Sequence, residues 1–227
     1  MDSTVVVVPM YNESAVVGEV LARVRSSFDR VVCVDDGSAD GSDAIARATG
    51  ATVLRHAVNL GQGAALQTGF DWVLASTRAT HVVTFDADGQ YSVDDALAMV
   101  DLAQRTGVDI VLGSRNLGRT DGQPLARRVL MRAALGFSRR STGLALTDTH
   151  NGLRVLNRKA LLAMSLRQRG MAHASEIESR ISSAGLSWVE HPITMTYTDY
   201  TRRKGQSNVN AFNVVFDLAA ERIGAVL

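Results

Sequence analysis

Short runs of β-branched residues alternate with stretches of helical periodicity along the first half of the chain. The apolar runs lie at Thr4 to Val8, Val31 to Val34, Thr52 to Leu54, His81 to Phe85 and Asp109 to Leu112. Between them, apolar residues recur every three or four positions, as at Val17, Val20 and Val24, which places them on one face of a helix. This alternation predicts right-handed βαβ units and a mainly parallel sheet.

The pattern changes beyond Arg115. It predicts a glycine-rich loop, a basic helix from Leu125 to Phe137, strands at Leu153 to Leu156 and Trp188 to Tyr197, and helices at Asn157 to Ser165 and Ala174 to Ala184. Because no long linker or repeat interrupts the chain, we expect residues 1–208 to form one α/β domain. Residues 209–227 carry polar side chains at helical spacing. We expect an amphipathic helix there, lying on a membrane or on a partner.

Composition excludes several classes of protein. With 46% hydrophobic residues among 227, the chain can bury a sizeable core. A net charge of +1 argues against nucleic acid as a partner, because such binding needs many basic contacts to phosphate. Cys33 is the single cysteine, so no intrachain disulfide forms, which fits a reducing cytoplasm. No basic leader and no run of about 20 apolar residues is present, so we expect a soluble or peripheral chain.

Five polar clusters follow the predicted strands. They are Pro9 to Glu13, Asp35 to Ser38, Asn59 to Gly63, Asp86 to Gln90 and Gly113 to Arg115. Ligands of an open parallel sheet bind at the carboxyl ends of its strands. We therefore expect these clusters to converge on one rim of the sheet.

Asp86, Asp88 and Gln90 offer oxygen ligands on a short turn. Oxygen suits hard ions such as Mg²⁺ or Mn²⁺, and Mg²⁺ usually completes its coordination with substrate phosphates and water. The motif by itself is weak, because Asp and Gly are also common in solvated turns. The hypothesis is a metal ion that neutralises a leaving diphosphate.

Two other clusters point to a nucleotide. The carboxylate of Asp36 suits the N–H edge of uracil or guanine, although Asp36 or Ser38 could equally cap the following helix. The amides of Asn59 to Gly63 precede a helix, where they could meet phosphate. Neither a Walker loop nor a Gly-x-Gly-x-x-Gly fingerprint is present, which disfavours a P-loop enzyme or a dinucleotide dehydrogenase.

Taken together, four ordered motifs resemble those of family 2 glycosyltransferases of the GT-A fold, a Rossmann-like three-layer α/β architecture. The motifs are Val8-Pro9-Met10-Tyr11-Asn12-Glu13, Val34-Asp35-Asp36-Gly37-Ser38-Ala39-Asp40-Gly41, Asn59-Leu60-Gly61 and Phe85-Asp86-Ala87-Asp88-Gly89-Gln90. The resemblance covers residues 4 to about 208. Its later half is similar to the dolichol/polyprenyl-phosphate mannosyltransferase branch, through Gly113-Ser114-Arg115 and Arg202-Arg203-Lys204-Gly205-Gln206-Ser207-Asn208.

The resemblance implies a role for particular residues. Those implied to hold the nucleoside are Pro9, Tyr11, Glu13, Val34 and Asp36, with Ala87 near the ribose or phosphate. It implies that Asp86, Asp88 and Gln90 hold the metal, and that Arg115 and Arg202 line the reacting phosphates. We also assign Arg128 to the acceptor phosphate, although Arg127 or Arg132 could take that role. The branch has a lysine where this chain has Asn208, and Lys204 is near enough in sequence to replace it.

The implied reaction is an inverting transfer of a hexose or N-acetylhexosamine from a nucleotide-diphosphate sugar to polyprenyl phosphate. A phosphomonoester acceptor is largely dianionic at neutral pH and needs no base. Positioning and charge neutralisation would then dominate, with Asp88, Arg115, Arg202 and Glu176 as the catalytic candidates. The donor nucleotide stays open between UDP and GDP, and a weak analogy favours UDP.

Two rival functions remain. A transferase that extends a glycan would need a carboxylate base, for which Glu176 and Asp148 are candidates. The other rival is a regulator that binds a sugar nucleotide without catalysis. The presence together of the metal and arginine candidates disfavours it: Asp86, Asp88, Gln90, Arg115 and Arg202. The polyprenyl hypothesis adds two partners. The first is the inner membrane surface, which the basic helix would reach. The second is a small integral membrane protein, of the kind that works with the short members of the branch that this chain resembles.

Overall fold

The computed structural model of the chain describes residues 3–121, 135–136, 139–140, 142–149, 151–170, 172–196 and 200. Most of the expected basic helix, Arg128, Arg202, Lys204 and residues 209–227 lie outside these described residues. The expected boundary between residues 208 and 209 therefore stays a prediction.

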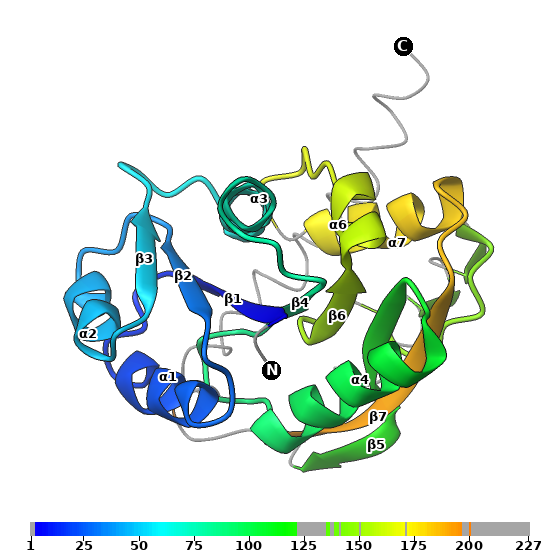
Figure 1. The fold of residues 1–227 in the computed structure, drawn as a ribbon, viewed down its shortest axis with the longest axis horizontal. Helices are drawn as coiled ribbons and strands as arrows, with labels where there is room; N and C mark the ends of the chain where they lie inside the picture. The colour runs from blue at the N-terminus through cyan, green and yellow to red at the C-terminus, as the bar shows by residue number, and fades with distance from the viewer. Residues whose placement is uncertain are drawn as a thin grey trace.

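The described chain folds as a three-layer α/β structure around one seven-stranded sheet, as the sequence predicts (Figure 1). The first half contains β1 (Thr4–Met10), α1 (Val17–Arg25), β2 (Val31–Asp35), α2 (Ser42–Ala48), β3 (Thr52–Arg55), α3 (Gln62–Ser76), β4 (His81–Thr84) and α4 (Val93–Thr106). The second half contains β5 (Ile110–Asp121), β6 (Arg154–Asn157), α6 (Arg158–Ala163), α7 (His173–Ser183) and β7 (Trp188–Thr196).

The strand order is β3-β2-β1-β4-β6-β5-β7. Strands β1 to β4 are parallel to one another, and β5 is parallel to β7. Strand β6 runs antiparallel to both of its neighbours, β4 and β5. It enters the sheet at the rim where β4 ends, because Arg154, its first residue, pairs with Thr84. The second half of the chain thus returns directly to the edge where ligands are expected.

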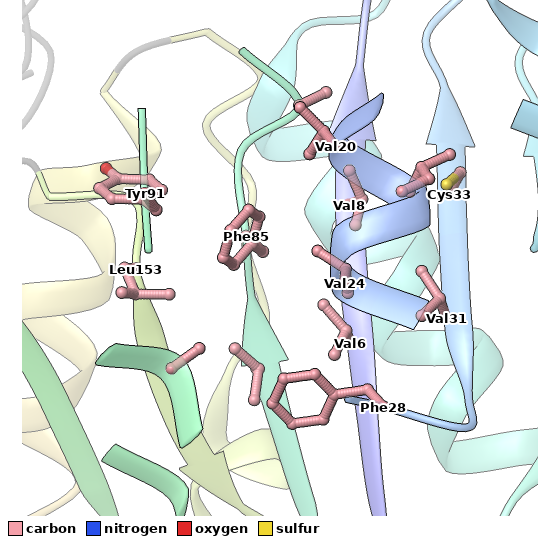
Figure 2. Packing of buried hydrophobic residues seen from close by; sticks show 14 of the residues in the cluster. Val6, Val8, Val20, Val24, Phe28, Val31, Cys33, Phe85, Tyr91 and Leu153 are labelled. Carbon is pink, nitrogen blue, oxygen red and sulfur yellow. The ribbon is translucent and has the colours of Figure 1, made fainter. Parts of the chain in front are cut away.

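Two hydrophobic clusters fill the spaces between the sheet and its helices. The first lies under α1 and α4 and contains Val20, Phe28, Phe85 and Leu153 (Figure 2). The second lies under α3, α6 and α7 and contains Phe70, Leu161 and others. Strand β1 is buried along its whole length, since its alternate side chains enter different clusters. Burial on both faces is typical of a parallel sheet.

Cys33 is buried in β2 with a free thiol. No helix among the described residues is long and apolar enough to cross a membrane.

Candidate active site

The loops after β1 and β2 are joined at the rim. The backbone N–H of Asn12 donates to Ser38 Oγ at 2.9 Å, and the N–H of Ala39 donates to Asn12 Oδ1 at 3.0 Å. Asn12 has a φ of 52°, a left-handed conformation that Asn tolerates better than most residues. The N–H of Glu13 donates to Ser42 Oγ at 2.8 Å. These bonds fix two of the expected nucleotide loops relative to one another.

The residues expected to hold the nucleoside differ in what they expose. Tyr11 is 43% exposed at the rim, so its ring is available for stacking. Pro9, Val34 and Ala87 are buried, so their side chains offer little surface to a nucleotide. The carboxylate of Glu13 is buried and accepts a hydrogen bond of 2.7 Å from the hydroxyl of Tyr200.

Asp36 is bonded mainly within the protein. Its Oδ1 accepts from His56 Nδ1 at 2.7 Å and from the N–H of Leu60 at 2.8 Å, and its Oδ2 accepts from the N–H of Gly61 at 2.7 Å. A carboxylate has about four lone-pair positions, so one on Oδ2 remains for a base. Asp36 is only 3% exposed. Its expected contact with the base stays a prediction that is limited to this one position.

The glycine motif before α3 packs against another loop. The N–H of Gly63 donates to the carbonyl of Arg169 at 2.8 Å. A Cβ on Gly63 would lie 2.0 Å from the carbonyl oxygen of Gln168, and one on Gly61 would lie 2.2 Å from that of Arg169. The amides of residues 60, 61 and 63 are therefore committed inside the protein, and for these three amides the expected contact with phosphate is wrong.

Asp86 and Asp88 follow β4 at the same rim. Gln62 Nε2 donates to Asp86 Oδ1 at 2.9 Å, and the N–H of Gln90 donates to Asp88 Oδ1 at 3.0 Å. Loss of solvent raises the pKa of Asp86 above its ordinary value, although the charge of Arg154 and a hydrogen bond from Tyr91 oppose this effect. The turn therefore presents two half-buried carboxylates, each of which accepts a hydrogen bond from the protein.

Arg115 and Asp148 form a buried ion pair. Arg115 Nε donates to Asp148 Oδ2 and its Nη2 to Asp148 Oδ1, both at 2.7 Å, and Nη2 also donates to the carbonyl of Thr149. The backbone N–H of Arg115 adds a fourth bond, to Asp148 Oδ2. This two-pronged geometry is the strongest form of an arginine–carboxylate pair. It occupies both oxygens of Asp148.

Glu176 anchors a loop. Its Oε2 accepts from the N–H groups of Arg167 and Gln168 at 2.8 and 2.9 Å, and its Oε1 pairs with Arg180. That loop also supplies the carbonyls that contact the start of α3. The position of Glu176 thus fits a role in holding the loop.

The family model of glycosyl transferase family 2 matches residues 5–163. The chain belongs to this family. It is 31% identical to the polyprenol monophosphomannose synthase of Mycolicibacterium smegmatis, over 93% of this chain and 82% of that protein. It is 27% identical to the UDP-N-acetylglucosamine–dolichyl-phosphate N-acetylglucosaminyltransferase of Methanococcus voltae, over 97% and 96%. The solved structure of Mycobacterium tuberculosis glucosyl-3-phosphoglycerate synthase with Mn²⁺ and UDP-glucose has a TM-score of 0.69 at 20% identity, covering 87% of this chain and 72% of that one.

Two residues near the acidic turn of this family 2 glycosyltransferase escaped the sequence analysis. Arg154 is 4% exposed, its Nη1 has no hydrogen-bond partner among the described residues, and it interacts electrostatically with Asp86, Glu178 and Asp148. Tyr91 is buried, with its hydroxyl bonded to the N–H of Gly152. Arg154 lies in an otherwise apolar strand, and Tyr91 directly follows the Asp86–Gln90 motif. No motif in the sequence therefore identifies either residue as part of the site.

The acidic turn fits a divalent metal by its charge and its donors. The groups linked electrostatically around it are the carboxylates of Glu13, Asp86, Asp88, Asp148 and Glu178 and the guanidinium groups of Arg115 and Arg154. Carboxylates outnumber cations in this set. Within the described part of the chain, no three His, Cys, Asp or Glu side chains gather as a ready-made metal site. An ion here would thus depend on two carboxylates, Gln90 and substrate oxygens, the arrangement typical of Mg²⁺ with nucleotides.

Proposed function

We propose that this chain is a metal-dependent hexosyltransferase that moves a sugar from a nucleotide-diphosphate donor to polyprenyl phosphate. The observation that carries the proposal is the turn at the end of β4, where Asp86 and Asp88 belong to an electrostatic network with more carboxylates than guanidinium groups. Two relatives with nearly matching lengths are named for transfer to polyprenol or dolichyl phosphate. A structural neighbour was solved with Mn²⁺ and UDP-glucose, which supports a divalent ion and favours UDP as the donor nucleotide.

The proposed roles follow from the positions of the side chains. Asp86, Asp88 and Gln90 would hold Mg²⁺ or Mn²⁺, which when bound neutralises charge on the leaving diphosphate. Tyr11 would stack on the base. Arg115 would lie near the acceptor phosphate, in the orientation set by its hydrogen bonds to Asp148 and to the carbonyl of Thr149.

The carboxylates favour a phosphate acceptor over a glycan hydroxyl. A hydroxyl acceptor needs a base within hydrogen-bond reach, and Asp148 and Glu176 were the candidates. Both oxygens of Asp148 accept hydrogen bonds from Arg115. In Glu176, one oxygen accepts from two loop amides and the other pairs with Arg180. A dianionic phosphomonoester attacks without a base. A phosphate acceptor is therefore compatible with the hydrogen bonds that occupy both Asp148 and Glu176.

The remaining roles are proposals that lie outside the described residues. Arg128, Arg202 and Lys204 would contact the acceptor phosphates, and residues 209–227 would form the amphipathic helix. A polyprenyl acceptor places the reaction at a membrane surface, here proposed to be the cytoplasmic face, with a small integral membrane protein as a candidate partner.

The test is transfer from a panel of labelled UDP and GDP sugars to polyprenyl phosphate in detergent, with Mn²⁺ or Mg²⁺. Wild type is compared with Asp88→Asn and with Asp94→Asn, which alters an exposed aspartate of α4 as a matched control. We expect a mild-acid-labile glycolipid from wild type and the control, and at least a 100-fold loss in Asp88→Asn, of the order caused by loss of a major electrostatic contact.

Other outcomes separate the rivals. Transfer to a glycan but to no lipid would establish the glycan-extending function. Metal-dependent nucleotide binding with neither transfer nor donor hydrolysis, even when native membranes are supplied, would establish a binding protein.

A further inference from the structure

Tyr91 connects the hydrophobic core to the acidic turn. Its ring lies in the cluster under α1 and α4, and it meets Phe85 edge to face with 5.8 Å between ring centroids. Figure 2 shows the ring near Phe85 and Leu153, with the hydroxyl at its outer end. The backbone of Tyr91 also forms a bridge with Met195 of β7. The ring is therefore held in one orientation, and with it the position of the hydroxyl.

The hydroxyl of Tyr91 lies between an amide and a carboxylate. It accepts a hydrogen bond of 2.8 Å from the N–H of Gly152 and makes a hydrogen bond to Asp86. A hydroxyl has one proton to donate, and because the amide already donates to it, that proton is directed to Asp86.

Asp86 is constrained from two further directions. Gln62, the first residue of α3, donates from Nε2 to Asp86 Oδ1 at 2.9 Å. Gly152 passes so near that a Cβ there would lie 2.1 Å from Asp86 Oδ2. The hydrogen bonds from Tyr91 and Gln62 and the close backbone of Gly152 come from three different segments. Together they define the rotamer of the Asp86 carboxylate.

We propose that Tyr91 and Gln62 are positioning residues that hold the Asp86 carboxylate in the orientation that meets the metal ion and the donor diphosphate. This inference rests on the proposed function and adds residues to it. Donors to a metal-binding carboxylate fix its direction and tune its affinity, and losing one typically costs about 10–100-fold in metal affinity or activity. Neither residue touches substrate in this proposal, since both act through Asp86.

The experiment measures Mn²⁺ binding in the presence of UDP by electron paramagnetic resonance, which needs no turnover. Tyr91→Phe removes the hydroxyl and keeps the ring, and Gln62→Met removes the amide donor and keeps the length of the side chain. We expect each variant to bind Mn²⁺ about 10–100-fold more weakly than wild type, and kcat at saturating donor to fall while KM for the lipid acceptor is unchanged.

Thr77→Val is the control for loss of a structural hydroxyl. Thr77 Oγ1 donates to the carbonyl of Val73 at the end of α3, the opposite end of the helix from Gln62. We expect Thr77→Val to lower the melting temperature and to leave Mn²⁺ affinity at the wild-type value. Gln62 is only half-buried, so Gln62→Met decides the question if Tyr91→Phe does not fold.

Folded Tyr91→Phe and Gln62→Met proteins that bind Mn²⁺ as wild type does would overturn the inference and leave the proposed function intact. Wild-type protein that binds UDP with no Mn²⁺ dependence would overturn both. A loss of Mn²⁺ affinity in the two variants, with Thr77→Val unaffected, would support the positioning role.

Discussion

Gly152 passes so close to Asp86 that a larger side chain would overlap the carboxylate. The overlap is with Oδ1, Oδ2 and Cγ together, all within 2.9 Å of a Cβ, so rotation of the carboxylate about the Cβ–Cγ bond of Asp86 alone does not relieve it. We predict that Gly152→Ala displaces Asp86 and lowers the transfer rate at least about 10-fold. Steady-state kinetics on protein with a wild-type circular dichroism spectrum is the measurement.

The matched control for this change is Gly170→Ala. A Cβ on Gly170 would meet nothing within 4 Å, so we expect wild-type activity. Full activity in Gly152→Ala as well would mean that Asp86 can move without consequence, and the close approach would then have no role in the reaction.

The pair between Arg115 and Asp148 is predicted to contribute to stability. Removing one partner of a buried ion pair leaves an uncompensated charge and costs about 3–5 kcal/mol. We therefore expect Asp148→Asn to lower the free energy of unfolding by that amount in urea denaturation. Asp101→Asn breaks a pair with Arg105 in which the side chains are 62% and 67% exposed, and it should cost less than about 0.5 kcal/mol. Equal losses in both variants would contradict a special role for the buried pair.

At the scale of elements, α3 and α7 are joined through the loop that Glu176 holds. In this loop, the carbonyl of Arg169 accepts a hydrogen bond from the N–H of Gly63. Glu176 accepts hydrogen bonds from the N–H groups of Arg167 and Gln168 in the same loop. Gln62, which donates to Asp86, is the residue that begins α3. The start of α7 thus supports a residue of the acidic turn without touching it.

This arrangement predicts different results for two substitutions of Glu176. Glu176→Gln keeps an acceptor oxygen and should retain most activity, whereas Glu176→Ala leaves two loop amides without their acceptor and should cost about 1–3 kcal/mol of stability. Activity and thermal unfolding of both variants are the measurements. Abolition of activity in a fully stable Glu176→Gln protein would instead identify Glu176 as a base and favour the glycan-extending function.

Sequence pattern predicted the elements better than it predicted their pairing. The strands and helices of the first half were predicted within a few residues, because burial on both faces makes the central strands β1 and β2 continuous apolar runs. Strand β6 was expected, but its antiparallel direction was not, since direction depends on partners more than 40 residues away. Separation along the sequence also hid the pairing of Arg115 with Asp148, which are 33 residues apart, and the placement of Arg154 near Asp86. Local motifs located the acidic turn, whereas Gln62 and Gly152, which constrain Asp86 together with the neighbouring Tyr91, come from distant segments.

On the scale of the whole molecule, Asp109 joins the second half of the sheet at the edge opposite the acidic turn. It precedes β5 and accepts from Asn157 Nδ2 at 3.0 Å, from Lys159 Nζ at 2.8 Å, and from the N–H and Oγ of Ser187 at 2.9 and 3.0 Å. One carboxylate thus links the segments that contain β5, β6, α6 and β7. Burial disfavours its charge, but the bonds from Lys159, Ser187 and Asn157 outweigh this effect and hold the pKa of Asp109 below its ordinary value.

A depressed pKa makes this link sensitive to acid. The folded state favours the ionised form, so its contribution to stability is complete above the unfolded pKa of about 3.9 and is lost as the pH falls through the lower folded pKa. We predict that Asp109→Asn is less stable than wild type by about 2 kcal/mol at pH 7, and that the difference narrows below about pH 4. Urea denaturation of both proteins from pH 7 to pH 3 is the measurement. A difference that stays constant across this range would show that the geometry of the side chain, and not its charge, holds these four elements together.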